Sequence, residues 1–191
     1  LRDFSIGRGT RLLRRGGISS PADLPGLVAW FDAGAANSLY EDAGLGTPAN
    51  DDADVVGSWR DLSGADNHAA QGTAANKPTR QNAEVNGLPV VRFDGSNDQM
   101  ATPSLDLSDG FGIFIVHKTT GDGMFLSWSG GNHQVRIGEG GGNVLSAFDG
   151  TTTRTSGALA IARTEWALVE YIYNGVNLTF YQKGGQAGAA A

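Results

Sequence analysis

The sequence predicts an all-β protein built from antiparallel strands. Short segments rich in β-branched and aromatic residues recur along the chain, and many of them alternate in polarity. Between them stand Asn-Gly and Asp-Gly dipeptides, which adopt positive φ at low cost and therefore close hairpins. No repeat with a period of about 20 to 50 residues is visible, which argues against a propeller or a solenoid.

Each expected strand is a short apolar or alternating run bounded by turn-forming residues. The intervening stretch 33–54, with its alanines, glycines, asparagines and five acids, predicts a long polar excursion on the surface. The expected strands are 26–33, 55–60, 88–93, 111–118, 124–128, 134–137, 144–148, 166–173 and 178–182.

Two of these strands are apolar along most of their length and are expected to be central. They read G-I-F-I-V-H at 112–117 and W-A-L-V-E-Y-I-Y at 166–173. Large apolar side chains on such strands are expected to fill the core between two sheets. The candidate core residues are Phe114, Val116, Leu168 and Tyr171.

The length of 191 residues fits one domain with an arm. We expect a basic N-terminal arm at 1–17, a linker at 18–25 and the folded domain at 26–191. The chain has no cysteine, so disulfides and cysteine-ligated zinc are excluded. No apolar run approaches the roughly 20 residues of a membrane-spanning helix, so no membrane partner is expected.

The charge is unevenly distributed along the chain. Residues 1–15 carry five arginines against the single acid Asp3, a net of +4, whereas the other 176 residues carry 9 basic and 19 acidic side chains, a net of −10. An acidic body argues against nucleic-acid binding, which needs clustered cations. The arm is either a disordered leader or an anchor that docks on an acidic partner. The anchor residues would be Arg2, Arg8, Arg11, Arg14 and Arg15.

Two polar loops follow short strands and give the chain a recognisable pattern. The pattern consists of these two loops and one earlier segment. The loops read W-R-D-L-S-G-A-D-N-H at 59–68 and F-D-G-S-N-D at 93–98, and the earlier segment reads G-L-V-A-W-F-D-A at 26–33. Together they resemble the laminin-G-like, concanavalin A-like jelly rolls of bacterial surface proteins and phage virion proteins, over roughly residues 24 to 183. The resemblance implies a two-sheet antiparallel jelly-roll sandwich.

Domains of that kind usually end with a closing strand that pairs near the first strand. The terminal A-G-A-A-A has neither the β-branched residues nor the alternation of a strand. The domain is therefore expected to lack its closing strand. Either the biological chain continues beyond Ala191 or a neighbouring subunit covers the sheet edge.

The sequence does not predict an enzyme. Some concanavalin A-like proteins are glycoside hydrolases, which need two carboxyl groups facing one cleft. The E-x-D-x-x-E pattern of laminarinase-like enzymes is absent, and Glu165 and Glu170 would face opposite sides of a strand. The histidines His68, His117 and His133 show no metal-ligand spacing, and the first two are expected to be structural.

Calcium is the one cofactor that the polar loops could take, because it prefers carboxylate, amide and carbonyl oxygens. The alternative is that these side chains bond neighbouring backbone amides and need no ion. Asp51, Asp52 and Asp54 form a third acidic cluster, expected to be a solvated charge run. The candidate calcium ligands are Asp61, Asp66 and Asn67 in one loop and Asp94, Asn97 and Asp98 in the other.

A glycan site needs an aromatic face beside polar side chains on an exposed rim. Trp128 with Asn132 and His133 is the candidate, and core packing of Trp128 is the alternative. Trp30 and Trp59 are expected in the core.

These observations predict a non-enzymatic phage virion surface protein, which decorates the capsid, forms a head fibre or belongs to the tail. Its partners would be capsid or tail proteins in an oligomeric assembly, with host-surface glycans as a further ligand. The alternative is a secreted or cell-surface bacterial adhesin module that binds glycans. The expected location is the virion surface, or the extracellular or bacterial cell surface for the adhesin.

Overall fold

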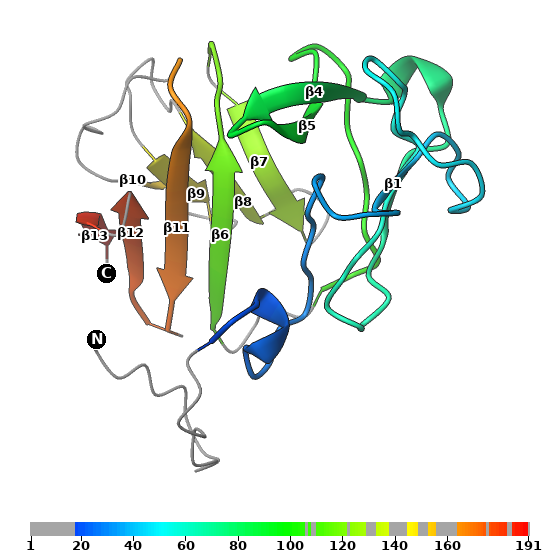
Figure 1. Cartoon of the computed structure of the whole chain (residues 1–191). Helices are drawn as coiled ribbons and strands as arrows, with labels where there is room; N and C mark the ends of the chain where they lie inside the picture. The colour runs from blue at the N-terminus through cyan, green and yellow to red at the C-terminus, as the bar shows by residue number, and fades with distance from the viewer. Residues whose placement is uncertain are drawn as a thin grey trace.

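A computed structural model gives the architecture of the chain (Figure 1). In the part of the chain that it describes, strands in antiparallel sheets dominate, and the helices are two single 3-10 turns, η1 (Pro21–Asp23) and η2 (Ala74–Asn76). The all-β prediction is confirmed. The structure describes residues 18–105, 107, 110–121, 123–128, 133–137, 145–148, 153–155, 164–174, 176–182 and 185–190.

Two four-stranded antiparallel sheets form the larger part of the fold, and Figure 1 shows one in front of the other. The front sheet has the order β13-β12-β11-β6 and the rear sheet the order β10-β9-β8-β7. The front strands are β6 (Phe111–His117), β11 (Ala167–Tyr173), β12 (Leu178–Gln182) and β13 (Gly185–Ala190). The rear strands are β7 (Gly123–Trp128), β8 (His133–Ile137), β9 (Leu145–Phe148) and β10 (Thr153–Thr155).

The N-terminal half contributes shorter elements. A small sheet is made of three two-residue strands, and β4 and β5 form a hairpin at the top of Figure 1. Asn86 and Gly87 close that hairpin with φ of 51° and 76°, the two positive values that a type I′ turn requires. The bounds are β1 (Leu39–Tyr40), β2 (Ser58–Trp59), β3 (Ala69–Ala70), β4 (Thr79–Val85) and β5 (Leu88–Arg92).

The two large sheets share one apolar core. Val169, Tyr171 and Phe180 of the front sheet are fully buried against Leu145 and Ala147 of β9. The rings of Tyr171 and Phe180 meet edge to face, with centroids 5.6 Å apart. The prediction that Tyr171 lies in the core is confirmed.

The prediction for the other three core candidates is wrong. Phe114, Val116 and Leu168 are 59%, 61% and 36% exposed, respectively. They lie on the outer face of the front sheet, while their neighbours Ile113 and Ile115 turn toward the core. Because almost every residue of β6 is apolar, its sequence does not reveal which alternate set is buried.

A second cluster of buried residues lies in the N-terminal half. Ala33, Leu39, Ala49 and Val56 pack together, with Trp59 against them. The prediction that 33–54 is a surface excursion is correct for many of its residues, which are exposed, but it is wrong for Ala33, Leu39 and Ala49. Its few apolar side chains are spaced irregularly and show no period in the sequence.

Backbone contacts also hold this second cluster together. Gly57 lies so close to Glu41 that a Cβ at position 57 would overlap the Glu41 carbonyl oxygen. The Gly57 N–H donates to Tyr40 O over 2.7 Å. Glycine is thus required at position 57 for close approach of two backbones.

Three strand predictions need correction. Residues 26–33 form no strand, and of 55–60 only Ser58 and Trp59 pair as one. Residues 187–190 of the terminal A-G-A-A-A, expected not to supply a strand, belong to β13, which pairs with β12. Ladder bonds come from backbone groups, so Gly and Ala can form them without β-branched side chains. The remaining expected strands correspond to β5, β6, β7, β8, β9, β11 and β12.

Candidate functional site

The loop that follows β2 is organised around the carboxylate of Asp61, which is only 4% exposed. The carboxylate accepts the N–H of Trp30 at 2.8 Å and the N–H of Asn67 at 3.0 Å. It also accepts the N–H and the hydroxyl of Ser63, at 2.9 and 2.7 Å. Four donors therefore converge on one buried carboxylate.

The same loop is tied to the segment 26–33 by its other polar side chains. The amide nitrogen of Asn67 donates to Val28 O at 2.8 Å. The Asp61 N–H donates to Nδ1 of His68 at 3.1 Å, so this ring nitrogen acts as an acceptor within the loop. His68 therefore has a structural role, in agreement with the sequence prediction.

Burial and hydrogen bonding act in opposite directions on Asp61. Burial alone raises the pKa of a carboxyl group, but the bonds from Ser63, Trp30 and Asn67 favour the charged form. The net effect is a pKa below its ordinary value of 3.8. Asp61 is consequently held as an anion by hydrogen-bond donors, and no described cationic side chain lies within 4.0 Å of its carboxylate.

The second polar loop repeats this design at the surface. Asp94 Oδ1 accepts the N–H groups of Ser96 and Asn97, at 2.8 and 3.1 Å. Asp98 Oδ2 accepts the Asp94 N–H at 2.9 Å, and the Asn97 amide donates to Ala75 O at 2.7 Å. The bonds from Ser96, Asn97 and Asp98 lower the pKa of Asp94 below 3.8.

In both loops, side chains form hydrogen bonds to nearby backbone groups. This is the arrangement that the sequence analysis gave as the alternative to calcium binding. Of the six candidate ligands, Asp66 projects most freely, with a side chain 90% exposed and 3.8 Å from His68 Nε2. Among the described residues, no group of three or more His, Asp or Glu side chains is placed to hold a metal ion. Calcium binding stays a prediction.

Three other carboxylates have roles that the sequence analysis missed. Asp42 accepts the N–H groups of Thr47, Gly44 and Gly46, at 2.5, 2.7 and 3.1 Å, and these bonds lower its pKa below 3.8. Asp52 accepts the Asn82 N–H at 2.8 Å, and Asp54 accepts that of Asp51 at 2.7 Å. Asp51 and Asp52 are exposed, as expected of a solvated charge run, but two acids of the run also bind backbone N–H groups. Glycine two residues after Asp42 was the available signal for its turn.

The histidine and glutamate side chains that the structure describes are not gathered at one place. His117 is buried at the end of β6, and burial lowers its pKa from 6.5 to about 4. Glu84 pairs with Arg92 across the β4–β5 hairpin at 2.7 Å. Glu165 lies in a turn, whereas Glu170 lies within β11.

The proposed glycan residues lie at the hairpin between β7 and β8. Trp128 and His133 are directly opposite each other in the ladder. Asn132 and the side chains of Trp128 and His133 are outside the described residues, as are all five arginines of the arm. Trp59 and Trp30 are half-buried, and the Trp59 ring lies 5.6 Å from that of Phe31.

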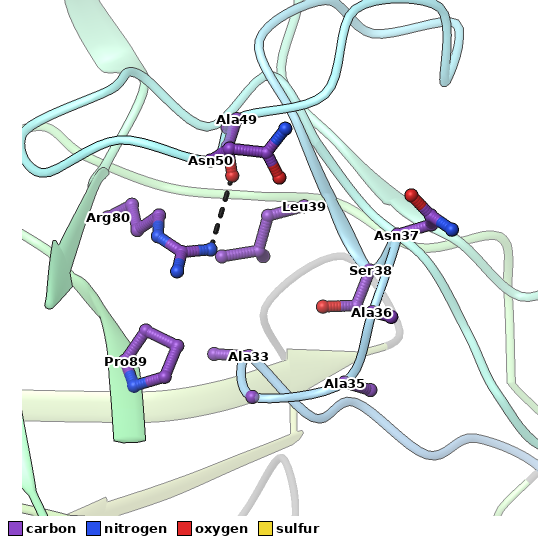
Figure 2. A pocket seen from close by; sticks show the side chains of 11 residues that line it. Ala33, Ala35, Ala36, Asn37, Ser38, Leu39, Ala49, Asn50, Arg80 and Pro89 are labelled. Atoms are coloured by element: carbon purple, nitrogen blue, oxygen red, sulfur yellow. Dashed lines mark hydrogen bonds between the residues drawn. The ribbon is translucent and has the colours of Figure 1, made fainter. Parts of the chain in front are cut away.

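A polar hollow that no motif indicates lies beside the second core cluster (Figure 2). Its volume is about 180 Å³. Small residues at 33–36 form one wall, and Arg80 and Pro89 of the β4–β5 hairpin form the other. The remaining lining residues are Asn37, Ser38, Leu39, Ala49 and Asn50.

Comparison with known proteins gives no relative: no family model, no curated protein and no solved structure matches this chain. Within the described ranges, no helix has the length and apolar character needed to cross a membrane.

Proposed function

We propose that this protein is a non-enzymatic surface protein of a phage virion, on the capsid, in a head fibre or on the tail. A jelly roll of the concanavalin A-like kind would be displayed, and the arm at 1–17 would anchor it. The observation that carries this proposal is the charge asymmetry: an arm of +4 precedes a body of −10. Such a distribution steers one end of a molecule toward an acidic surface.

The way the polar loops are used supports a displayed scaffold. The carboxylates of Asp61 and Asp94 accept backbone N–H groups, which stiffens the loop between β2 and β3 and the loop that follows β5. The outer face of the front sheet, with Phe114 and Val116 exposed, is available for contact with a neighbouring subunit. Both features suit a rigid module within a larger assembly.

The test is incorporation into particles. Protein lacking 1–17 should fold but no longer co-sediment with particles to which the full chain binds. A matched variant with all five arm arginines changed to lysine should retain binding, and one with all five changed to glutamine should lose it. Normal incorporation of the truncated chain would exclude the anchor.

The second candidate is a secreted or cell-surface bacterial adhesin module that binds glycans. The polar hollow lined by Arg80, Ser38 and Asn50 favours it, because sugars are bound by a few convergent polar groups in a concave site. A mass-spectrometric inventory of purified particles separates the two functions: presence of the chain supports the virion protein, and its recovery from cell envelopes supports the adhesin.

A further inference from the structure

The hollow exists because one of its walls has almost no side chains. The run A-G-A-A at 33–36 faces the β4–β5 hairpin, where Pro89 and Arg80 project from neighbouring strands (Figure 2). Asn37 and Asn50 are exposed at the rim and can both donate and accept hydrogen bonds. The space of about 180 Å³ suits one small polar molecule or one terminal residue of a larger one.

Arg80 is held rigidly at the edge of this space. Its backbone N–H donates to Asp54 O at 2.8 Å, and its carbonyl accepts the Ala53 N–H at 2.9 Å. Its side-chain Nε donates to Asn82 Oδ1 at 2.9 Å and its Nη1 donates to Ala49 O at 3.2 Å. The guanidinium is therefore fixed before any ligand arrives.

The charge of Arg80 is not neutralised by an ion pair with any described residue, since no described carboxylate lies within 4.0 Å of it. Its Nη2 has no hydrogen-bond partner among those residues. A planar guanidinium with donors to spare matches the geometry of a carboxylate. The unbonded nitrogen of the guanidinium, Nη2, therefore favours a ligand with a carboxylate group.

Ser38 supplies a second and independent indication. The residue is 1% exposed, and its Oγ is buried without a hydrogen-bond partner in the described part of the chain. Figure 2 shows this oxygen directed into the hollow, on the side opposite Arg80. Buried hydroxyls are normally satisfied, so the hydrogen-bonding capacity of this one remains open for a polar group placed in the hollow.

Nearby acids limit the charge of that group. Asp32 Oδ1 accepts the Gly34 N–H at 2.8 Å, and Asp52 Oδ1 accepts the Asn82 N–H at 2.8 Å. The two carboxylates bond neighbours of the hollow, Gly34 of its wall and Asn82, the side-chain partner of Arg80. They disfavour a second negative charge on the ligand. A monoanion therefore fits better than a dianion such as phosphate.

We propose that the hollow binds a carboxylate that carries adjacent hydroxyl groups. The carboxylate would pair with the free edge of the Arg80 guanidinium, a ligand hydroxyl would meet Ser38 Oγ, and the amides of Asn37 and Asn50 would contact the remaining hydroxyls. A uronic acid at the end of a glycan and a free hydroxy acid share this chemistry. The site goes beyond the anchoring function and is independent of the arm.

The experiment is a titration of the full chain, followed by NMR or calorimetry, with glucuronate, a uronic-acid oligosaccharide and lactate. Glucose is the matched neutral control, and inorganic phosphate tests for simple anion binding. Glucuronate should bind and glucose should not. Stronger binding of the oligosaccharide indicates a glycan source, whereas binding of lactate as strong as that of glucuronate indicates a free hydroxy acid.

Variants assign the binding to the hollow. Arg80→Gln should weaken glucuronate binding about tenfold or more, because a charge-assisted bond is lost. Ser38→Ala removes no hydrogen bond within the described part of the chain, so it should keep the fold and weaken binding several-fold. Arg92→Gln, which alters an arginine outside the hollow, should have no effect.

The proposal fails if folded wild-type protein binds no uronate, or binds glucose or phosphate equally well. It also fails if Ser38→Ala and Arg80→Gln both bind as the wild type does. Because incorporation into particles is not measured, these outcomes leave the anchoring function untouched.

Discussion

At the scale of single residues, carboxylates that accept several backbone N–H groups fix the conformation of three loops in this protein. Asp61 gathers four donors from Trp30, Ser63 and Asn67, and Asp42 and Asp94 do the same in shorter turns. Each such bond favours the ionised form, so the pKa values of all three acids are lowered. Loop shape is therefore coupled to ionisation.

Asp61→Asn should destabilise the fold by about 1–3 kcal/mol, because the new amide nitrogen would face N–H groups in a buried site. Asp66→Asn, in the same loop but with an exposed side chain, is the matched control and should leave stability nearly unchanged. Chemical denaturation of both variants measures the difference. Equal stability of Asp61→Asn and the wild type would contradict the structural role, and calcium-dependent stability lost only in Asp61→Asn would favour an ion site.

His117 should make stability depend on pH in a defined window. Its folded pKa of about 4 lies below the ordinary 6.5, so the unfolded chain takes up a proton first as the pH falls. The contribution is complete above pH 6.5 and is lost toward pH 4, by about 3 kcal/mol in total.

Denaturant unfolding at several pH values between 7 and 4 tests this, with His117→Asn as the comparison. The variant should be less stable at pH 7 but should lose less stability on acidification. A parallel decline in both proteins would show that other groups cause it. The Asp61 contribution falls in a separate window, below about pH 3.8, since its pKa is lowered from that value.

At the scale of elements, both faces of the front sheet carry large apolar side chains, but those of the inner face are buried and those of the outer face are exposed. The inner face carries Tyr171 and Phe180, both fully buried, and the outer face carries Phe114 and Val116, both largely exposed. The strand pairing Val116↔Leu168 places two apolar side chains side by side on the outer face. The apolar outer face is thus a property of the sheet and not of one side chain.

Phe180→Ala should cost about 3–5 kcal/mol, because it leaves a cavity between the two sheets. Phe114→Ala, the same change on the outer face, should cost less than about 1 kcal/mol in the isolated protein. Thermal or chemical unfolding of the two variants gives the comparison. A large loss for Phe114→Ala in dilute, monomeric protein would show that its ring is covered.

At the scale of the whole molecule, charge is the feature that separates the arm from the body. The arm carries +4 and the body −10, so an anchored chain would direct its acidic body away from an acidic partner. Among the described residues of the body, most buried apolar side chains belong to two clusters, one between the large sheets and one in the N-terminal half. The arm precedes the half that holds the smaller cluster.

Arm-dependent binding to particles should weaken as the salt concentration rises, because exposed charges separated by more than roughly 8–10 Å are screened near physiological ionic strength. The variant with all five arm arginines changed to glutamine should show little salt dependence. Co-sedimentation across a salt series measures both. Salt-independent binding of the wild type would show that apolar contacts, and not the arginines, hold the chain.

The sequence by itself determined what depends on neighbouring residues. Asn86-Gly87 specifies a hairpin turn through its tolerance of positive φ, and apolar runs such as 167–173 specify strands through their propensity. The polar loop around Asp61 was also visible, since its turn-forming residues are close in sequence. The all-β class follows from such local signals.

Tertiary structure decided which faces are buried and which distant residues meet. The apolar run of β6 offers two equivalent faces, so only packing against the rear sheet selects Ile113 and Ile115 over Phe114. Ser38 and Arg80 belong to no common sequence motif. They line the same hollow because backbone hydrogen bonds attach the β4–β5 hairpin to the segment that contains Ala53 and Asp54. Long-range contacts of this kind leave no periodic signal in the chain, which is why the polar hollow became visible only in the fold.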